Sequence, residues 1–201
     1  MIPTGRHEKS ELPSAMARDS GDGGLVVLGL GNPIITDDAV GLRVVEQVQE
    51  LLLRDPVPGV EILLSTRAGF ELIDLLTGFR HAVIVDCLNL PHSTPGRIRH
   101  LQLDDLVGCT RLNCIHEINI GTAFELARQL DIAMPHAVDI FAVEVADTVT
   151  LSETMTPAVE AVVAPLAGEL HRLLKNLAGS VTVRPPGEAP GTRTARAFYQ
   201  P

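Results

Sequence analysis

The sequence predicts an α/β protein, in which helices cover both faces of a β-sheet, and two observations support this fold class. Short apolar runs typical of buried strands alternate along the chain with segments in which apolar residues recur at helical spacing. Hydrophobic residues make up 45% of the 201 residues, but aromatic residues only 3%. The core must therefore consist of Leu, Val, Ile and Ala, as in layered α/β proteins. A chain of this length suffices for one domain with a full core.

Five segments have the pattern of β-strands. Residues 25–30 and 81–87 are nearly continuous apolar runs, as expected of strands buried on both faces. Residues 97–103 alternate between apolar and polar, which predicts a half-exposed strand. The remaining predicted strands are residues 60–64 and 139–145.

Four helices are expected between and after these strands, over residues 39–53, 69–76, 119–130 and 156–177. The first contains valines at helical spacing, and its expected N-cap is Asp37 or Asp38. Pro165 falls inside the last helix and should kink or split it, because proline removes a helical hydrogen bond.

The two ends of the chain differ from its middle. Residues 1–24 are rich in Gly, Ser and charged residues, which predicts a disordered leader. Residues 179–201 contain the sequence PPGEAPG and are expected to form a flexible tail. Residues 25–178 are then the single α/β domain.

Charge and hydropathy exclude several classes of function. The net charge of −9 would repel a nucleic-acid backbone, so no nucleic-acid partner is expected. No apolar segment approaches the roughly 20 residues of a membrane span. The polar N-terminus lacks the apolar core of a signal peptide, so we expect a cytoplasmic protein that does not associate with membranes.

The three cysteines are interpreted as reduced thiols. Cys87, Cys109 and Cys114 are odd in number, which argues against a disulfide framework. Cys109, Cys114 and His116 are an alternative zinc site, although the spacing C-x4-C-x-H is not that of a zinc finger.

Three polar residues follow predicted elements at positions suited to chemistry. Asp38 comes after the first strand, Asp86 ends the strand AVIVD, and His116 lies in the loop CIHEIN. The carboxyl ends of the first and third strands can be neighbours in a doubly wound sheet. Two carboxylates and an imidazole there would suit a divalent transition metal with open coordination positions, or acid–base catalysis. Each residue alone could instead be a helix cap, a turn cap or a loop histidine.

The glycine-rich turn GLGNPI admits two other interpretations. It contains the first two glycines of a dinucleotide-binding loop, but Ile34 occupies the third glycine position. Asp37 and Asp38 would also lie where a pyrophosphate binds. GLGNP resembles peptidyl-tRNA hydrolases as well, but the early catalytic histidine of that family is missing, and an acidic protein suits tRNA poorly.

Several motifs, in this order, resemble the nickel–iron hydrogenase maturation endopeptidases. They are GLGNPIITDDAVG, RAGFELIDLL, VIVDC, CIHEINIGTAFELAR and MTPAVEAVV, and the resemblance covers about residues 25–175. The specific part is the pattern G-x-G-N-x4-D-[DE]-x2-G, followed by an aspartate at a strand end and by a loop histidine of the HEINIG type.

The resemblance implies a fold and an activity. The fold is a three-layer α/β/α arrangement with a twisted, mostly parallel five-stranded sheet, of the phosphorylase/hydrolase-like type. The implied activity is that of a cytoplasmic endopeptidase of the aspartyl type, which removes the C-terminal peptide of the hydrogenase large-subunit precursor after nickel insertion. No Ser or Cys nucleophile is assigned in this family, and the sequence contains no G-x-S-x-G motif.

The resemblance also implies a site and a partner. Asp38, Asp86 and His116 match the metal-contacting residues of the family and are the expected catalytic and metal-binding residues. The nickel belongs to the precursor, so no tightly bound cofactor is expected. The expected partner is the nickel-loaded precursor, and the protein itself is expected to be a monomer.

The chain departs from the family pattern after the second predicted strand, and the resemblance leaves one alternative function open. Ser65, Thr66 and Arg67 stand where many members have Gly-Gly-Thr, and Arg67 is either a receptor for an acidic group of the precursor or an exposed loop residue. The alternative function is a nickel-binding or chaperone-like maturation factor that has the same fold and no hydrolytic activity.

Overall fold

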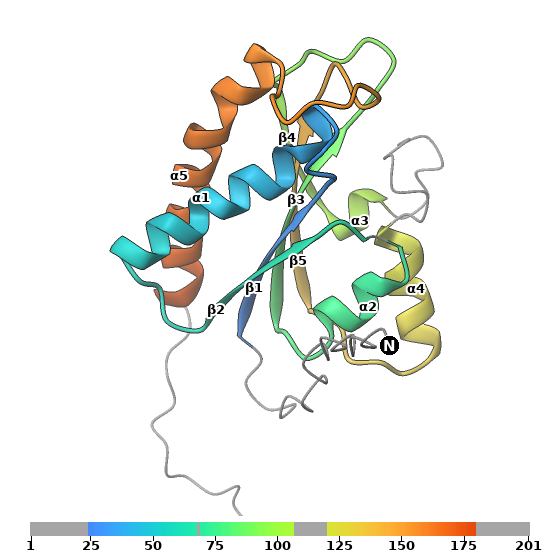
Figure 1. Ribbon diagram of the computed structural model, residues 1–201. Helices are drawn as coiled ribbons and strands as arrows, with labels where there is room; N and C mark the ends of the chain where they lie inside the picture. Colours follow the sequence, from blue (N-terminus) through green and yellow to red (C-terminus); the bar gives the residue numbers. More distant parts are fainter. Residues whose placement is uncertain (1–23, 68, 107–119, 180–201) are drawn as a thin grey trace, which may run out of the picture.

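The computed structural model describes residues 24–67, 69–106 and 120–179, which contain one five-stranded sheet (Figure 1). Its strands are β1 (Leu25–Leu30), β2 (Val60–Ser65), β3 (His81–Leu88), β4 (Ile98–Gln102) and β5 (Ala137–Glu144), in the spatial order β2-β1-β3-β5-β4. Three of the four strand pairs are parallel, and only the pair of β4 with β5 is antiparallel. The prediction of a mostly parallel five-stranded sheet is confirmed.

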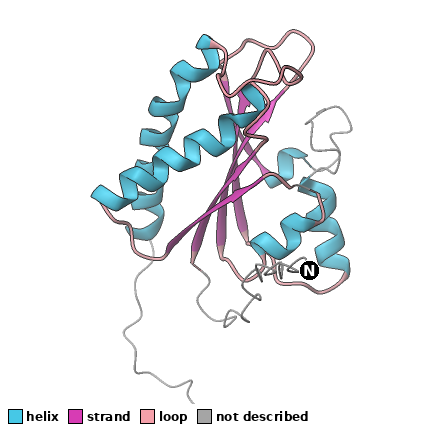
Figure 2. Ribbon diagram, in the orientation of Figure 1, coloured by secondary structure: helices cyan, strands magenta, loops and turns pink. Residues whose placement is uncertain are grey.

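Helices lie on both faces of this sheet and form the outer two layers (Figure 2). The elements are the 3-10 turn η1 (Asp37–Ala39) and the helices α1 (Val40–Arg54), α2 (Glu71–Leu76), α3 (Leu103–Leu106), α4 (Ile120–Gln129) and α5 (Pro157–Gly179). Helices α1 and α5 cover one face, and α2 and α4 cover the other. Helix α3 was not predicted, because its four residues are too few to show helical periodicity.

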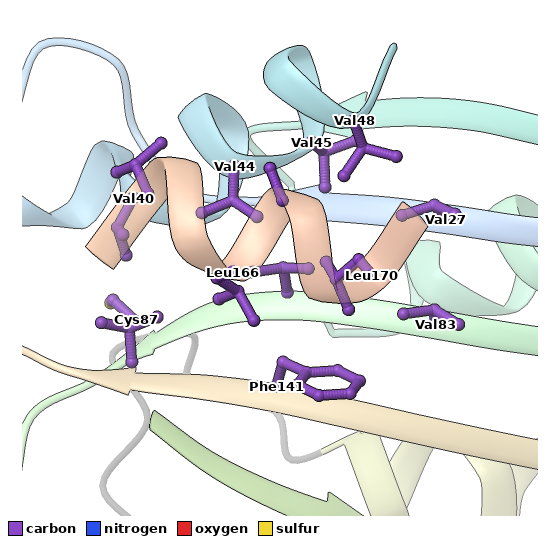
Figure 3. Packing of buried hydrophobic residues seen from close by; sticks show 14 of the residues in the cluster. Val27, Val40, Val44, Val45, Val48, Val83, Cys87, Phe141, Leu166 and Leu170 are labelled. Atoms are coloured by element: carbon purple, nitrogen blue, oxygen red, sulfur yellow. The ribbon is translucent and has the colours of Figure 1, made fainter. Parts of the chain in front are cut away.

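The core consists of two apolar layers separated by the sheet. Every residue of β1 is buried, because alternate side chains enter opposite layers and both layers are covered. Val27 enters the layer under α1 and α5, which also contains Leu166, and it lies near Val83 and Leu170 (Figure 3). Val26 belongs to the layer under α2 and α4.

Helix α5 runs through Pro165 without interruption, so the expected split of this helix is wrong. The ring of Pro165 is on the exposed side, while Val163, Leu166 and Ala167 beside it are buried against the sheet. Packing on both sides of the proline therefore holds the helix together despite the lost hydrogen bond.

The expected leader and tail lie outside the described residues, apart from Gly24 and Gly179. Gly24 precedes β1 directly, and Gly179 is the last residue of α5. Among the described residues, no helix is long and apolar enough to span a membrane.

Candidate active site

The sheet has a topological switch point between β1 and β3. The chain leaves β1 through α1 toward β2 on one side, whereas β3 has β5 and β4 on its other side. Ligands of open α/β sheets bind at such points, outside the carboxyl ends of the strands. We call this end of the parallel strands the carboxyl edge; Asp38 and Asp86 both belong to it.

Asp86 lies where β3 extends beyond β1. The pairing of β1 with β3 ends at Gly29 and Val85, but β3 continues beside β5 as far as Leu88. The predicted strand over residues 81–87 is therefore one residue too short, and Asp86 lies within β3 instead of at its end. The reason is that β5 still offers a hydrogen-bonding partner after β1 has turned away.

Two glycines bring the turn that carries Asp38 onto the ends of these strands. A Cβ atom on Gly31, whose φ is +148°, would lie 2.0 Å from the carbonyl oxygen of Asp38. A Cβ atom on Gly41 would lie 2.2 Å from the carbonyl oxygen of Leu30 and 2.4 Å from that of Val85. The glycines of the motif therefore serve close backbone packing in this chain.

Asp38 is buried and bonded to the strand that carries Asp86. Asp38 is only 3% exposed. The thiol of Cys87 donates to Oδ1 of Asp38 over a distance of 2.9 Å. Asp38 and Cys87 are 49 residues apart in the sequence, so this contact joins two separate elements at the carboxyl edge.

Asp86 is also buried, at 5% exposure, and its Oδ1 accepts a hydrogen bond of 2.8 Å from the backbone N–H of Cys87. Cys87 thus contacts both aspartates, one through its backbone and one through its thiol. Both carboxylates lie at the carboxyl edge and are nearly excluded from water, and buried negative charge of this kind attracts a cation.

The neighbouring Asp37 has a different role, which the sequence analysis missed. Oδ1 of Asp37 accepts the N–H of Thr156 at 2.7 Å, and Oδ2 accepts the N–H groups of Ala146 and Asp147 at 3.1 Å each. Oδ2 also accepts the hydroxyl of Thr156 at 3.0 Å. This fully buried carboxylate connects the loop between β5 and α5 to the turn before α1 through these hydrogen bonds.

The prediction that Asp37 or Asp38 caps the first helix is wrong. Ala39 is the N-cap of α1, and neither α1 nor η1 has a side-chain cap hydrogen bond. The two carboxylates instead bond to the β5–α5 loop and to Cys87. Those partners are 109 to 119 residues away for Asp37, so no local sequence signal identifies them.

The loop fastened by Asp37 has further bonds to the turn after β1. The N–H of Thr36 donates to the carbonyl of Thr150, and Ile35 forms an isolated antiparallel bridge with Leu151. Within the loop, hydrogen bonds from Thr150 and from the N–H of Val149 hold the pKa of Asp147 below its usual range. The two loops therefore form one unit beside Asp38.

An ion pair between a buried carboxylate and a partly exposed arginine lies on the other side of this edge. Glu144, at the end of β5, accepts hydrogen bonds of 2.6 Å from the N–H of Thr94 and from Nε of Arg99. The pKa of this carboxyl is below its ordinary value, mainly because it accepts the hydrogen bond from the Thr94 N–H and also because of the bond and charge of Arg99. Burial acts in the opposite direction. Glu144 thereby fixes the segment that follows β3.

His116, the third predicted site residue, lies outside the described residues, as do Cys109 and Cys114 of the alternative zinc site. Within the described ranges, no group of three His, Cys, Asp or Glu side chains is arranged to hold a metal ion. Arg67 is exposed and forms an ion pair of 3.5 Å with Glu71.

Comparisons with known proteins show to which family this chain belongs. A family model described as hydrogenase maturation protease matches residues 42–172, a range that includes Asp86 and begins just after Asp38. The chain belongs to the hydrogenase maturation protease family. It is 31% identical over 153 residues to the hydrogenase 2 maturation protease of Escherichia coli, a match that covers 75% of this chain and 90% of that protein.

Solved structures agree with the family assignment. The hydrogenase maturating endopeptidase HybD from Escherichia coli superposes with a TM-score of 0.63 at 25% identity, covering 77% of this chain and 93% of that one. The [NiFe] hydrogenase maturation protease HycI from Thermococcus kodakarensis has the same fold, with a TM-score of 0.59 at 22% identity, over 78% of this chain and 96% of that one. The predicted family, the predicted fold and the prediction that the protein is a protease are confirmed.

Proposed function

We propose that this protease removes the C-terminal peptide of a nickel–iron hydrogenase large-subunit precursor after nickel insertion. In this proposal Asp38, Asp86 and His116 recognise the nickel ion that the precursor carries. The observation that carries the proposal is the pair of buried carboxylates, Asp38 and Asp86, on the two sides of the switch point in a member of this family.

The donor set suits a nickel ion that already has ligands of its own. Carboxylate oxygens and an imidazole nitrogen are ordinary ligands of divalent transition metals. Three protein ligands leave coordination positions that the precursor would fill. The nickel is thus part of the substrate, and the protease recognises a completed metal centre rather than storing metal.

Electrostatics gives the reason for a dependence on nickel. A precursor without nickel would cover Asp38 and Asp86 without bringing a cation to balance their negative charges, which costs several kcal/mol. A nickel ion removes that penalty and adds ligand bonds. A difference of about 4 kcal/mol corresponds to roughly a thousandfold in binding, enough to prevent processing before metal insertion.

The test compares nickel-loaded with nickel-free precursor as substrates of the purified full-length protein. Release of the C-terminal peptide is measured by mass spectrometry. We expect release from the loaded precursor alone. Equal rates for the two substrates would refute nickel recognition and would leave the carboxylates to act as acid–base catalysts.

Three variants test the residues. Asp38→Asn and Asp86→Asn keep an acceptor for the Cys87 thiol and N–H but remove the charge, so each should lower the rate of cleavage at least a hundredfold. His116→Ala should have a similar effect. Asp74→Asn, the same chemical change on the exposed side of α2, is the matched control and should process normally. Normal cleavage by the Asp86 variant would contradict the proposed site.

A further inference from the structure

We propose that Cys87 is a positioning residue for Asp38, which orients its carboxylate without neutralising it; this inference rests on the proposed function. The thiol donates to Oδ1 of Asp38 at 2.9 Å. Among the described residues, the structure shows no hydrogen bond to the other oxygen, Oδ2. The bond therefore assigns different roles to the two oxygens, one held by the strand and one left for the nickel ion.

The position of Cys87 on β3 places it between the core and the site. Successive residues of a strand point to opposite faces, so Cys87 and Asp86 enter different layers. Cys87 is 1% exposed and belongs to the apolar layer under α1 and α5, where it lies close to Val40 (Figure 3). Close packing fixes the sulfur, and the sulfur in turn fixes Asp38.

The chemistry of the donor is as relevant as its position. A lysine or arginine bonded to Asp38 would orient the carboxylate but would also compete with the nickel ion for its charge. A thiol is a weak, neutral donor. It therefore restricts the rotation of the side chain while the full negative charge remains available to a cation. Bonds that orient the ligands of a metal are known to affect affinity and activity by 10-fold to 100-fold.

Packing alone and positioning predict opposite orders for two substitutions of Cys87. Alanine removes the donor and leaves an apolar surface, whereas serine keeps a donor but buries a hydroxyl group in an apolar layer. If Cys87 only fills space, the alanine variant should be at least as stable and as active as the serine variant. If Cys87 positions Asp38, the serine variant should be the more active of the two, even where it is the less stable.

The experiment measures kcat and KM for nickel-loaded precursor with the wild-type protein, Cys87→Ala and Cys87→Ser, alongside a thermal melt of each. We expect kcat/KM to fall about tenfold in the alanine variant and to stay within about threefold of wild type in the serine variant, by analogy with losses at other ligand-orienting bonds. All rates are taken at a temperature at which each variant is folded.

A packing control separates loss of volume from loss of the donor. Val83 lies four residues earlier on the same face of β3 and is fully buried. Val83→Ala should lower the melting temperature without lowering kcat/KM. The inference is overturned if Cys87→Ala matches wild type in kcat/KM, or if the serine variant is impaired as much as the alanine variant. Absence of cleavage by the wild-type protein would instead refute the proposed function.

Discussion

Replacing Asp37 with asparagine should destabilise the protein although the side chain keeps its size. The carboxylate accepts four hydrogen bonds, three from backbone N–H groups and one from the hydroxyl of Thr156. Asparagine has one carbonyl oxygen and one NH2 group, and the NH2 group cannot accept an N–H. One orientation of the amide points its NH2 group at the N–H of Thr156, and the other points it at the N–H groups of Ala146 and Asp147.

The magnitude follows from the better of these two orientations. The amide oxygen would keep the bonds from Ala146 and Asp147, and the hydroxyl of Thr156 would be retained as a partner. One charge-assisted bond from the partly buried N–H of Thr156 would be lost, which costs about 1.5–3 kcal/mol. Asp37→Ala would lose all four bonds and should cost about 3–5 kcal/mol, a large part of the 5–15 kcal/mol that stabilises a typical domain.

The assay is urea denaturation of the purified protein, followed by circular dichroism, with Asp74→Asn as the control for the loss of one surface charge. That control should lie within about 0.5 kcal/mol of wild type. An Asp37→Asn variant that is as stable as the control would refute the reasoning, because it would show that these bonds do not hold the β5–α5 loop to the first turn.

Three further predictions concern other parts of the fold. Glu144→Gln should lower stability by about 1.5–3 kcal/mol at neutral pH. Because the pKa of Glu144 is lowered in the folded state, its contribution is complete above the unfolded value of about 4.3 and is lost as the pH falls through the folded value. Melting temperatures of wild type and variant should therefore converge on acidification, and a constant difference down to pH 2 would contradict this account. Gly41→Ala places a Cβ atom 2.2 Å and 2.4 Å from two strand carbonyl oxygens, so it should lower the free energy of unfolding by about 3 kcal/mol, measured by thermal melting. An unchanged melting temperature would show that the first turn of α1 can move away. Pro165→Ala adds the missing backbone N–H on the exposed side of α5 and should raise the free energy of unfolding by about 1–3 kcal/mol. A lower melting temperature of this variant would show that the helix depends on the proline.

The sequence by itself determined the layers of this protein and the edge at which the acids gather. The nearly continuous apolar runs of β1 and β3 predicted strands covered on both faces, and both strands are buried over most of their length. The valine spacing predicted α1 to within one residue at either end. These features depend on local periodicity, which a single segment contains in full.

Only the tertiary structure decided what each acid of the first motif does. Adjacent residues of identical type, Asp37 and Asp38, bond to partners 119 and 49 residues away, on the β5–α5 loop and on β3. The length of β3 beyond Asp86 depends on its pairing with β5, and the continuity of α5 at Pro165 depends on the layer beneath it. Each of these outcomes is set by groups from distant parts of the chain that meet only when the sheet has formed, and local sequence patterns do not encode which distant group a side chain will meet.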